Sequence, residues 1–376
     1  MREVCYTVTF SIPAFLGDAQ QNGRWRTPPF KAQLRQWWRV AYAAENGFNV
    51  IVGKMRSTEG ELFGNAWLEN NFRKSQVLLR LNRWEEGRFK KASWPADISV
   101  SHPEVKNREG KVVPVGSALY QGFGPLIFDN QRRTTTLKAN AAIRAEESAT
   151  LSLAYPAESA TLVEQALWLM HCYGTVGGRN RNGWGSYELF PSPSGRGDRG
   201  EGVPLRDWRA CLDRDWPHAI GKDERGPLIW QTTPHDDWRS LMRTLAIIKI
   251  GLRTQFKFTA GKNTPHTEDR HWLSYPVTNH SVHSWGNNAR LPNSLRFKVR
   301  KVDSGRLVGV IFHMPCLPPP SFDPDRAAII DVWKCVHRFL DNLCRPPAQL
   351  CPNADHKALA IQKQQLAGIT LKRIPE

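Results

Sequence analysis

Residues 174–186 read Gly-Thr-Val-Gly-Gly-Arg-Asn-Arg-Asn-Gly-Trp-Gly-Ser, a stretch rich in both glycine and arginine. Glycine has no Cβ atom and tolerates positive φ angles, so a glycine-rich loop can turn successive backbone N–H groups toward one anion. Arg179 and Arg181 add charge-assisted hydrogen bonds, which suit phosphate oxygens. The stretch therefore predicts a loop that grips phosphate groups.

The side chains within this glycine loop suggest how a nucleic acid would lie on it. Asn180 and Asn182 have the donors and acceptors to bond sugar hydroxyls. Trp184 either stacks on a base or anchors the loop in the core, and both interpretations stay open. The bland alternative is a tight turn whose arginines are incidental. The predicted RNA-contacting residues of the loop are Gly177, Gly178, Arg179, Asn180, Arg181, Asn182, Gly183 and Trp184.

The flanks of the loop exclude two familiar nucleotide-binding motifs. A helix is predicted over 161–172 before the loop, and a strand over 187–190 after it. The pattern GxxxxGK[ST] is absent, and the order helix–loop–strand is the reverse of a dinucleotide-binding fingerprint.

A second basic element lies near the N-terminus, after a predicted strand over 4–12. Thr27 and Pro28 predict a helix start, and apolar residues at helical spacing follow: Phe30, Leu34, Trp37 and Ala41.

Lys31, Arg35 and Arg39 recur on this helix at i, i+4 and i+8 and form a basic ridge. Arg24 and Arg26 precede it, and we count all five among the predicted RNA-binding residues. The alternative for the ridge is an ordinary solvated helix face.

Charge and composition favour a polyanionic partner. The chain has 376 residues, of which 52 are Lys or Arg and 35 are Asp or Glu, and the net charge is +17. The seven cysteines are scattered without a CxxC pair, so we expect no structural zinc, and we expect no cofactor. Without a signal-peptide pattern or a long apolar run, we expect a cytoplasmic protein with no membrane partner.

The segment 191–204, Pro-Ser-Pro-Ser-Gly-Arg-Gly-Asp-Arg-Gly-Glu-Gly-Val-Pro, is the strongest linker signal. We predict an N-terminal domain over 1–190, a linker over 191–224 and a C-terminal domain over 225–376. Strands are expected over 228–233, 295–302 and 307–312, and helices are expected to open at Asp236 and Asp237 and to run over 325–344. Their irregular alternation predicts an α+β fold with antiparallel sheets.

Five segments, in order and spacing, resemble the RAMP superfamily of CRISPR proteins, and most closely the first subunit of type III-B (Cmr) effector complexes. They are Thr27–Arg39, Leu62-Phe63-Gly64, 75–81, Tyr120-Gln-Gly-Phe-Gly-Pro (120–125) and Gly177–Ser186. The resemblance is specific over 1–190 and looser over 225–376. The sequence departs from it at Ala32, where the family usually has glycine, and at the asparagines 180 and 182.

This resemblance implies two tandem ferredoxin-like domains and a non-catalytic subunit at the end of a crRNA-bound filament. The implied partners are the 3′ region of the crRNA, the target RNA, the repeated backbone subunit and the small subunit.

An enzyme remains the rival interpretation, because some RAMP proteins process CRISPR transcripts by metal-independent RNA cleavage. Asp18 and His171 are the candidate acid–base residues. The alternative role for a histidine at the end of a helix is a structural hydrogen bond. The histidines 266, 271, 280 and 283 and the pair Cys335 and His337 lack a complete metal-ligand set. We therefore assign no catalytic and no metal-binding residue.

Overall fold

The computed structural model describes residues 1–66, 72–193, 202–256, 258–259, 261–344, 360 and 363–375. Its backbone contacts divide the chain into two compact units. The first unit consists of Met1–Pro95, Gly122–Leu205 and Phe297–Lys301, and the second of Ala96–Gln121, Arg206–Arg296 and Val302–Glu376. The domain limits 1–190 and 225–376 stay a prediction, and residues 194–201 of the predicted linker lie outside the described residues.

The first unit is built on a four-stranded sheet in the order β10-β1-β9-β2, with every neighbouring pair antiparallel. Its strands are β1 (Arg2–Phe10), β2 (Leu78–Leu81), β9 (Ser148–Tyr155) and β10 (Tyr187–Phe190). Helices α1 (Pro28–Glu45) and α2 (Val52–Phe63) connect β1 to β2, and α4 (Ala160–Tyr173) connects β9 to β10. This βαββαβ order is that of a ferredoxin-like unit.

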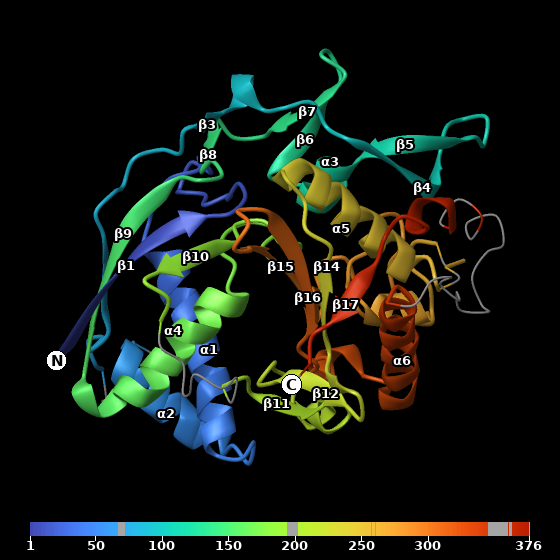
Figure 1. The fold of residues 1–376 in the computed structure, drawn as a ribbon. Helices are drawn as coiled ribbons and strands as arrows, with labels where there is room; N and C mark the ends of the chain where they lie inside the picture. The colour runs from blue at the N-terminus through green and yellow to red at the C-terminus, as the bar shows by residue number, and fades with distance from the viewer. Residues whose placement is uncertain are drawn as a thin grey trace. The chain divides into compact units, whose positions relative to one another are not determined.

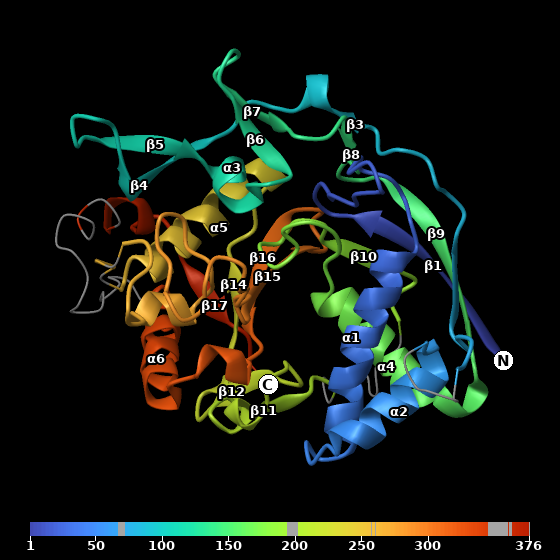
Figure 2. The ribbon, with the colours of Figure 1, turned by 180° about the vertical axis from the view of Figure 1, so that it is seen from behind.

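The core of the first unit lies between this sheet and the helices, and α1 and α4 pack together beside it (Figures 1 and 2). The predicted apolar stripe of α1, from Phe30 to Ala41, is buried as expected. The Phe30 ring lies 6.4 Å from that of Phe10 on β1 and 5.5 Å from that of Tyr187 on β10. Helix α1 begins at Pro28, but Thr27 has helical backbone angles and no side-chain capping bond, so its predicted capping role is wrong.

The stretch between β2 and β9 carries short elements that leave the main sheet. In the first unit these are β3 (Phe89–Lys90), η1 (Lys91–Ser93), the hairpin β6 (Leu126–Asp129) with β7 (Thr134–Leu137), and β8 (Ala141–Ala142), which pairs with β3. The short helix η2 (Ala157–Ser159) follows β9 and leads into α4. The second unit contributes the hairpin β4 (Ser99–Lys106) with β5 (Val112–Gly116), followed by α3 (Ser117–Gly122). Most of the chain between β2 and β9 thus forms short two-stranded pairings that are separate from the main sheet.

The second sheet has the order β15-β16-β14-β17, which is again a ferredoxin-like order along the chain. Its elements are β14 (Ile229–Thr232), α5 (Trp238–Arg253), β15 (Leu295–Lys301), β16 (Leu307–His313), α6 (Arg326–Asn342) and β17 (Leu371–Arg373). Asp237 and Asp325 cap α5 and α6 through bonds to backbone N–H groups, as expected for helix starts.

Smaller elements of this part of the chain are β11 (Leu205–Asp207), η3 (Ala210–Asp213), β12 (Ile220–Asp223), β13 (Gly226–Pro227), η4 (Asp269–Trp272) and η5 (Pro320–Phe322). The chain is therefore α+β with antiparallel sheets, as the sequence predicted.

Candidate nucleic-acid interface

The glycine loop, residues 174–186, joins α4 to β10 and is fastened to the segment that follows β1. The N–H of Gly178 donates to the carbonyl of Phe15 at 2.9 Å, and that of Gly185 donates to the carbonyl of Pro13 at 3.0 Å. Gly177 and Gly185 have φ angles of +91° and +68°, which disfavour any residue with a Cβ. The glycines therefore let the loop lie directly against neighbouring backbone.

Several N–H groups of the loop are already used inside the protein. Asn182 donates to the carbonyl of Arg179 at 2.9 Å, and Gly183 donates to that of Asn180 at 3.0 Å. Those two amides therefore close the loop and do not add to a backbone nest for a phosphate. Anion binding by the cationic side chains of the loop stays a prediction.

Arg179 and Arg181 stand at the exposed tip of the loop. Arg179 adopts a left-handed φ of +56°, and its Nε donates to the carbonyl of Phe123. Partial burial lowers the pKa of the Arg179 guanidinium, which still leaves it charged at neutral pH. The carbonyl of Arg181 accepts a hydrogen bond of 3.0 Å from the N–H of Phe297. This bond fixes the backbone immediately after Arg181.

Trp184 braces the loop from inside. Its side chain is fully buried, with ring centroids 5.0 Å from Phe15 and 6.1 Å from Trp94. The ring has no free face for a base, so of the two roles that the sequence left open the structure supports the structural one. Trp184 is therefore not among the residues that we propose to contact RNA. Asn180, which is half-buried, donates from Nδ2 to the carbonyl of Thr175 at 3.2 Å.

Lys298 holds the two ends of the loop together, a role that the sequence did not reveal. Its buried ammonium donates to the carbonyls of Gly174 and Tyr187 at 2.6 and 2.5 Å. Burial lowers the pKa of Lys298 to about 7; Glu188 raises it and Arg300 lowers it further. The neighbouring Val299 N–H donates to Oγ of Ser186 at 2.8 Å.

The basic ridge on α1 is bound to one buried carboxylate. Nε of Arg35 and Nε of Arg39 each donate at 2.9 Å to Glu59 of α2, whose side chain is almost fully buried. The two arginines therefore fasten α1 to α2 while their exposed parts face solvent. Of the two positive charges, one is balanced by Glu59 within the protein. The two arginines therefore offer a phosphate backbone less net charge than the sequence suggested.

A groove of about 460 Å³ lies beside the first turns of α1. Lys31 and Arg35 line one side of it, and the apolar segment before and in β2 lines the other. Burial, and then the charge of Arg35, lowers the pKa of Lys31. Ala32 also faces this groove, at the position where the resemblance has glycine. The full lining is Thr27, Pro28, Lys31, Ala32, Arg35, Ser75, Val77, Leu78 and Leu79.

Arg24 and Arg26 belong to the loop that leads into α1. Arg24 is exposed and lies 4.0 Å from a carboxylate oxygen of Asp18, whereas Arg26 donates to the carbonyl of Gly17. Arg26 is thus a structural anchor for the loop, and Arg24 is the more accessible of the two.

Both acid–base candidates of the enzyme interpretation have structural duties. The carboxylate of Asp18 accepts bonds of 2.9 Å from the N–H groups of Gln20 and Asn22 and so closes a turn. Nδ1 of His171 accepts a bond of 3.1 Å from the N–H of Leu189, and burial lowers the pKa of His171 to about 4.

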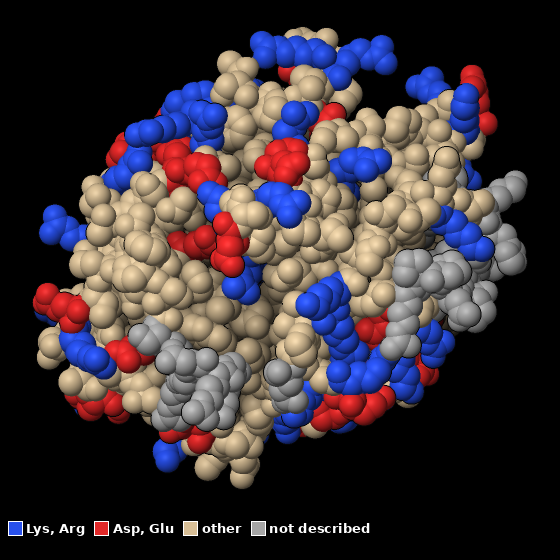
Figure 3. Space-filling model, viewed as in Figure 1, with Lys and Arg blue, Asp and Glu red and all other residues tan. Residues whose placement is uncertain are grey.

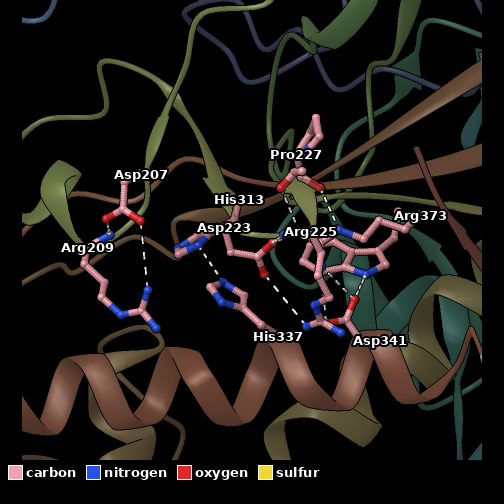
Figure 4. A network of polar contacts seen from close by, with 11 residues as sticks. Asp207, Arg209, Asp223, Arg225, Pro227, His313, His337, Asp341 and Arg373 are labelled. Carbon is pink, nitrogen blue, oxygen red and sulfur yellow. Dashed lines mark hydrogen bonds and ion pairs between the residues drawn. The ribbon is translucent and has the colours of Figure 1, made fainter. Parts of the chain in front are cut away.

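Three of the other histidines have hydrogen-bond partners within the protein. His271 accepts from the N–H of Glu268 at 3.0 Å, and His283 pairs with Asn263 at 3.1 Å. His337 shares a 2.9 Å bond with His313 in the interior of the second unit (Figure 4). In the described part of the chain, no cluster of three or more His, Cys, Asp or Glu residues is arranged to hold a metal ion.

Positive charge is distributed rather than gathered over the face shown in Figure 3, where basic and acidic side chains alternate. Basic side chains do collect at the tip of the β6–β7 hairpin, uppermost in that view, where Arg132 and Arg133 are exposed. The distribution of charge over this face therefore does not by itself locate an RNA-binding surface, and the RNA-contacting residues stay a prediction.

These loop and helix residues fall within the part of the chain that matches a known family. Residues 30–188 match the RAMP superfamily. This RAMP segment, residues 30–188, includes almost all of α1 with its ridge and the whole glycine loop. No curated protein matches the chain.

Two solved structures are similar to most of the chain but share little sequence with it. Cmr1 from Pyrococcus furiosus in its apo form is 15% identical, with 85% of this chain and 90% of that chain covered and a TM-score of 0.42. A chain of a type III-B Cmr-beta structure bound to cognate target RNA is 11% identical, with 88% and 99% covered and a TM-score of 0.43. Within the described residues, no helix has the length and apolar character needed to cross a membrane.

Proposed function

We propose that this chain is a non-catalytic RNA-binding subunit of a type III-B CRISPR ribonucleoprotein, acting in antiviral defence. It binds the 3′ region of the crRNA, the target RNA or both, at the end of the filament. Its partners are the repeated backbone subunit and the small subunit, and its location is the cytoplasm. The match of residues 30–188 to the RAMP superfamily supports this proposal.

The observation that carries the RNA-binding role is the exposed pair Arg179 and Arg181 on a loop of fixed backbone. The loop is fastened at Phe15, Pro13 and Phe297, so both arginines extend from a backbone of defined position. Two arginines on a fixed backbone bind phosphates with a smaller loss of conformational freedom than two arginines on a mobile loop. Lys31 and the exposed Arg24 are the next candidates, and Arg35 and Arg39 contribute only through the part not bound to Glu59.

Because phosphate binding releases counterions, the affinity for single-stranded RNA should fall steeply with salt. We expect Arg179→Ala with Arg181→Ala to weaken binding roughly tenfold or more and to reduce the slope of log affinity against log salt by about 1.4, at about 0.7 for each phosphate contact. Fluorescence anisotropy between 50 and 300 mM salt (roughly the range over which such affinities change strongly) measures both quantities.

A matched control removes two exposed arginines elsewhere, Arg290→Ala with Arg306→Ala, which changes the net charge equally. Equal losses for the two double variants would mean that only net charge matters and would contradict a dedicated loop. Incubation of the chain with a CRISPR repeat RNA, with and without EDTA, tests the rival function. Specific cleavage that persists in EDTA would favour a metal-independent processing endoribonuclease.

A further inference from the structure

Phe123 is a large apolar side chain that the structure places in solvent beside the glycine loop. It is 64% exposed and stands between Gly122 and Gly124 in the motif Tyr120–Pro125. A single exposed apolar residue is common on protein surfaces and by itself needs no explanation. What distinguishes Phe123 is the group that lies against its backbone.

That group is Arg179, the first of the two arginines of the loop. Its Nε donates to the carbonyl of Phe123, and a Cβ added at Gly124 would lie 3.5 Å from its Nη2. The loop and the turn also touch at a second point, since a Cβ added at Gly178 would lie 2.9 Å from Cγ of Pro125. The exposed ring and the exposed guanidinium are therefore held on one packed surface.

The turn that carries Phe123 is rigid. The N–H of Gly124 donates to the carbonyl of Leu126 at 3.1 Å, and Phe123 forms a β-bridge with Leu126, which is fully buried at the base of the β6–β7 hairpin. The carbonyl of Pro125 accepts a bond of 2.9 Å from the N–H of Lys138. A ring on a backbone fixed in this way loses little freedom when something stacks on it.

Basic residues lie on both segments that meet at this position. Arg179, whose Nε donates to the carbonyl of Phe123, stands on the loop with the exposed Arg181, and the exposed Lys138, whose N–H donates to the carbonyl of Pro125, follows the hairpin. A flat apolar ring among basic side chains is complementary to a nucleotide, which joins an aromatic face to an anionic phosphate.

We infer that Phe123 is a base-stacking position for an unpaired nucleotide of a single-stranded RNA whose phosphates are bound by Arg179 and Arg181. The inference rests on the proposed function and gives it a preferred ligand. Only an unpaired base can expose a whole face to an isolated ring, because neighbouring bases cover the faces in a duplex. It also moves the stacking role from the buried Trp184 to a residue that solvent reaches.

The test uses the full chain and two oligomers of one length, a single-stranded RNA containing 2-aminopurine and an abasic version of it. Phe123→Ala should weaken binding of the base-containing RNA by roughly 5- to 150-fold, the range for the loss of one stack. It should leave the salt slope and the affinity for the abasic oligomer unchanged. In the wild-type chain, binding should quench 2-aminopurine fluorescence, and Phe123→Ala should restore it.

Three variants keep the inference open to refutation. Phe123→Tyr, which keeps the ring, should bind as the wild type does, whereas Phe123→Leu, which keeps apolar bulk without a ring, should lose affinity as alanine does. Phe190→Ala removes a phenylalanine that is 75% exposed at the end of β10 and should have no effect. Equal binding by Phe123→Ala and Phe190→Ala, or equal losses for both oligomers, overturns the inference.

The outcome for the loop arginines separates this inference from the proposed function. If the arginine double variant weakens binding and Phe123→Ala does not, the stacking role is wrong while RNA binding stands. If the wild-type chain binds neither oligomer, both are wrong together.

Discussion

Gly185 is the residue at which the glycine loop comes closest to neighbouring backbone. A Cβ added there would lie 1.9 Å from the carbonyl oxygen of Val176, and the φ of +68° is itself unfavourable for other residues. The same two residues also close the loop by a hydrogen bond, since the N–H of Val176 donates to the carbonyl of Gly185 at 3.0 Å. Glycine is required here by contact as well as by backbone angle.

We expect Gly185→Ala to lower the free energy of unfolding by about 3 kcal/mol or more, because it combines left-handed strain with a steric overlap. The matched variant Gly47→Ala has a similar φ of +56° but no atom within 4 Å of the added Cβ, so it should cost only about 1–2 kcal/mol. Urea denaturation of both proteins measures the difference. Similar losses would show that contact at Gly185 is relieved by a small shift of the loop.

At the scale of elements, Lys298 of β15 fastens the stem of the glycine loop, and its ionisation should be visible in stability. The folded pKa of about 7 lies below the ordinary value of 10.5, so between these values the unfolded chain binds more protons than the folded one. Stability contributed by this group therefore rises with pH above about 7, by up to about 1.4 kcal/mol per pH unit.

Lys298→Met should abolish this rise, because methionine has a similar length and no titratable group. The measurement is the free energy of unfolding of both proteins at several values between pH 6.5 and 8.5. The cysteines, whose ordinary pKa is about 8.5, are common to both proteins, so their titration cancels in the difference. The wild-type value minus the variant value should increase across this range. A constant difference would mean that Lys298 keeps an ordinary pKa and only supplies hydrogen bonds.

A second element held by one side chain is the last strand, β17. Arg373 donates to the carbonyls of Pro227 and Gly226 and pairs with Asp223 and Asp341, both of which are largely buried (Figure 4). Burial alone would raise the pKa of Asp223, but the bonds from Arg373 and from the N–H of Arg225 hold it below its ordinary value. The ion pairs thus compensate for burying the carboxylates.

Arg373→Ala should lower the free energy of unfolding by about 2–3 kcal/mol, because Arg225 is then the one arginine of the described residues that pairs with the two buried carboxylates. Lys372→Ala, at the exposed neighbouring position, should change it by less than about 0.5 kcal/mol. Thermal unfolding of the two variants gives the comparison. Equal melting temperatures would show that β17 contributes little to the second unit.

At the scale of the whole molecule, buried histidines make the fold sensitive to acid. Burial lowers the pKa of His337 to about 3, and that of His102 and His171 to about 4, while an unfolded histidine titrates near 6.5. Below pH 6.5 the unfolded state therefore binds more protons, so stability is full above that value and is lost as the pH falls.

We expect the free energy of unfolding to fall between pH 6.5 and 4, with each such histidine contributing up to about 1.4 kcal/mol per pH unit. His337→Leu, which removes the group hydrogen-bonded to His313, should make this dependence shallower even though it lowers stability at neutral pH. Denaturation curves between pH 4 and 7 test this, and parallel pH profiles would contradict it.

The sequence by itself determined the elements whose patterns are local. Apolar spacing located α1, α4 and α6, alternation located β1, and aspartates located the starts of α5 and α6, because these signals depend only on neighbouring residues. It also identified the arginine–glycine loop as the candidate site. It missed α2 and β17, whose stability comes from long-range partners such as the Arg35–Glu59 and Arg373–Asp223 pairs.

Only the tertiary structure decided which residues of the candidate site face solvent. Trp184 and Phe123 are both aromatic residues beside glycines, yet one is buried among Phe15 and Trp94 and the other is exposed beside Arg179. Lys298 and Glu59 are charged residues that the sequence would place on the surface, yet both are buried against partners distant in the chain. The physical reason is that burial is set by which segments pack together, and residue type alone does not contain that information.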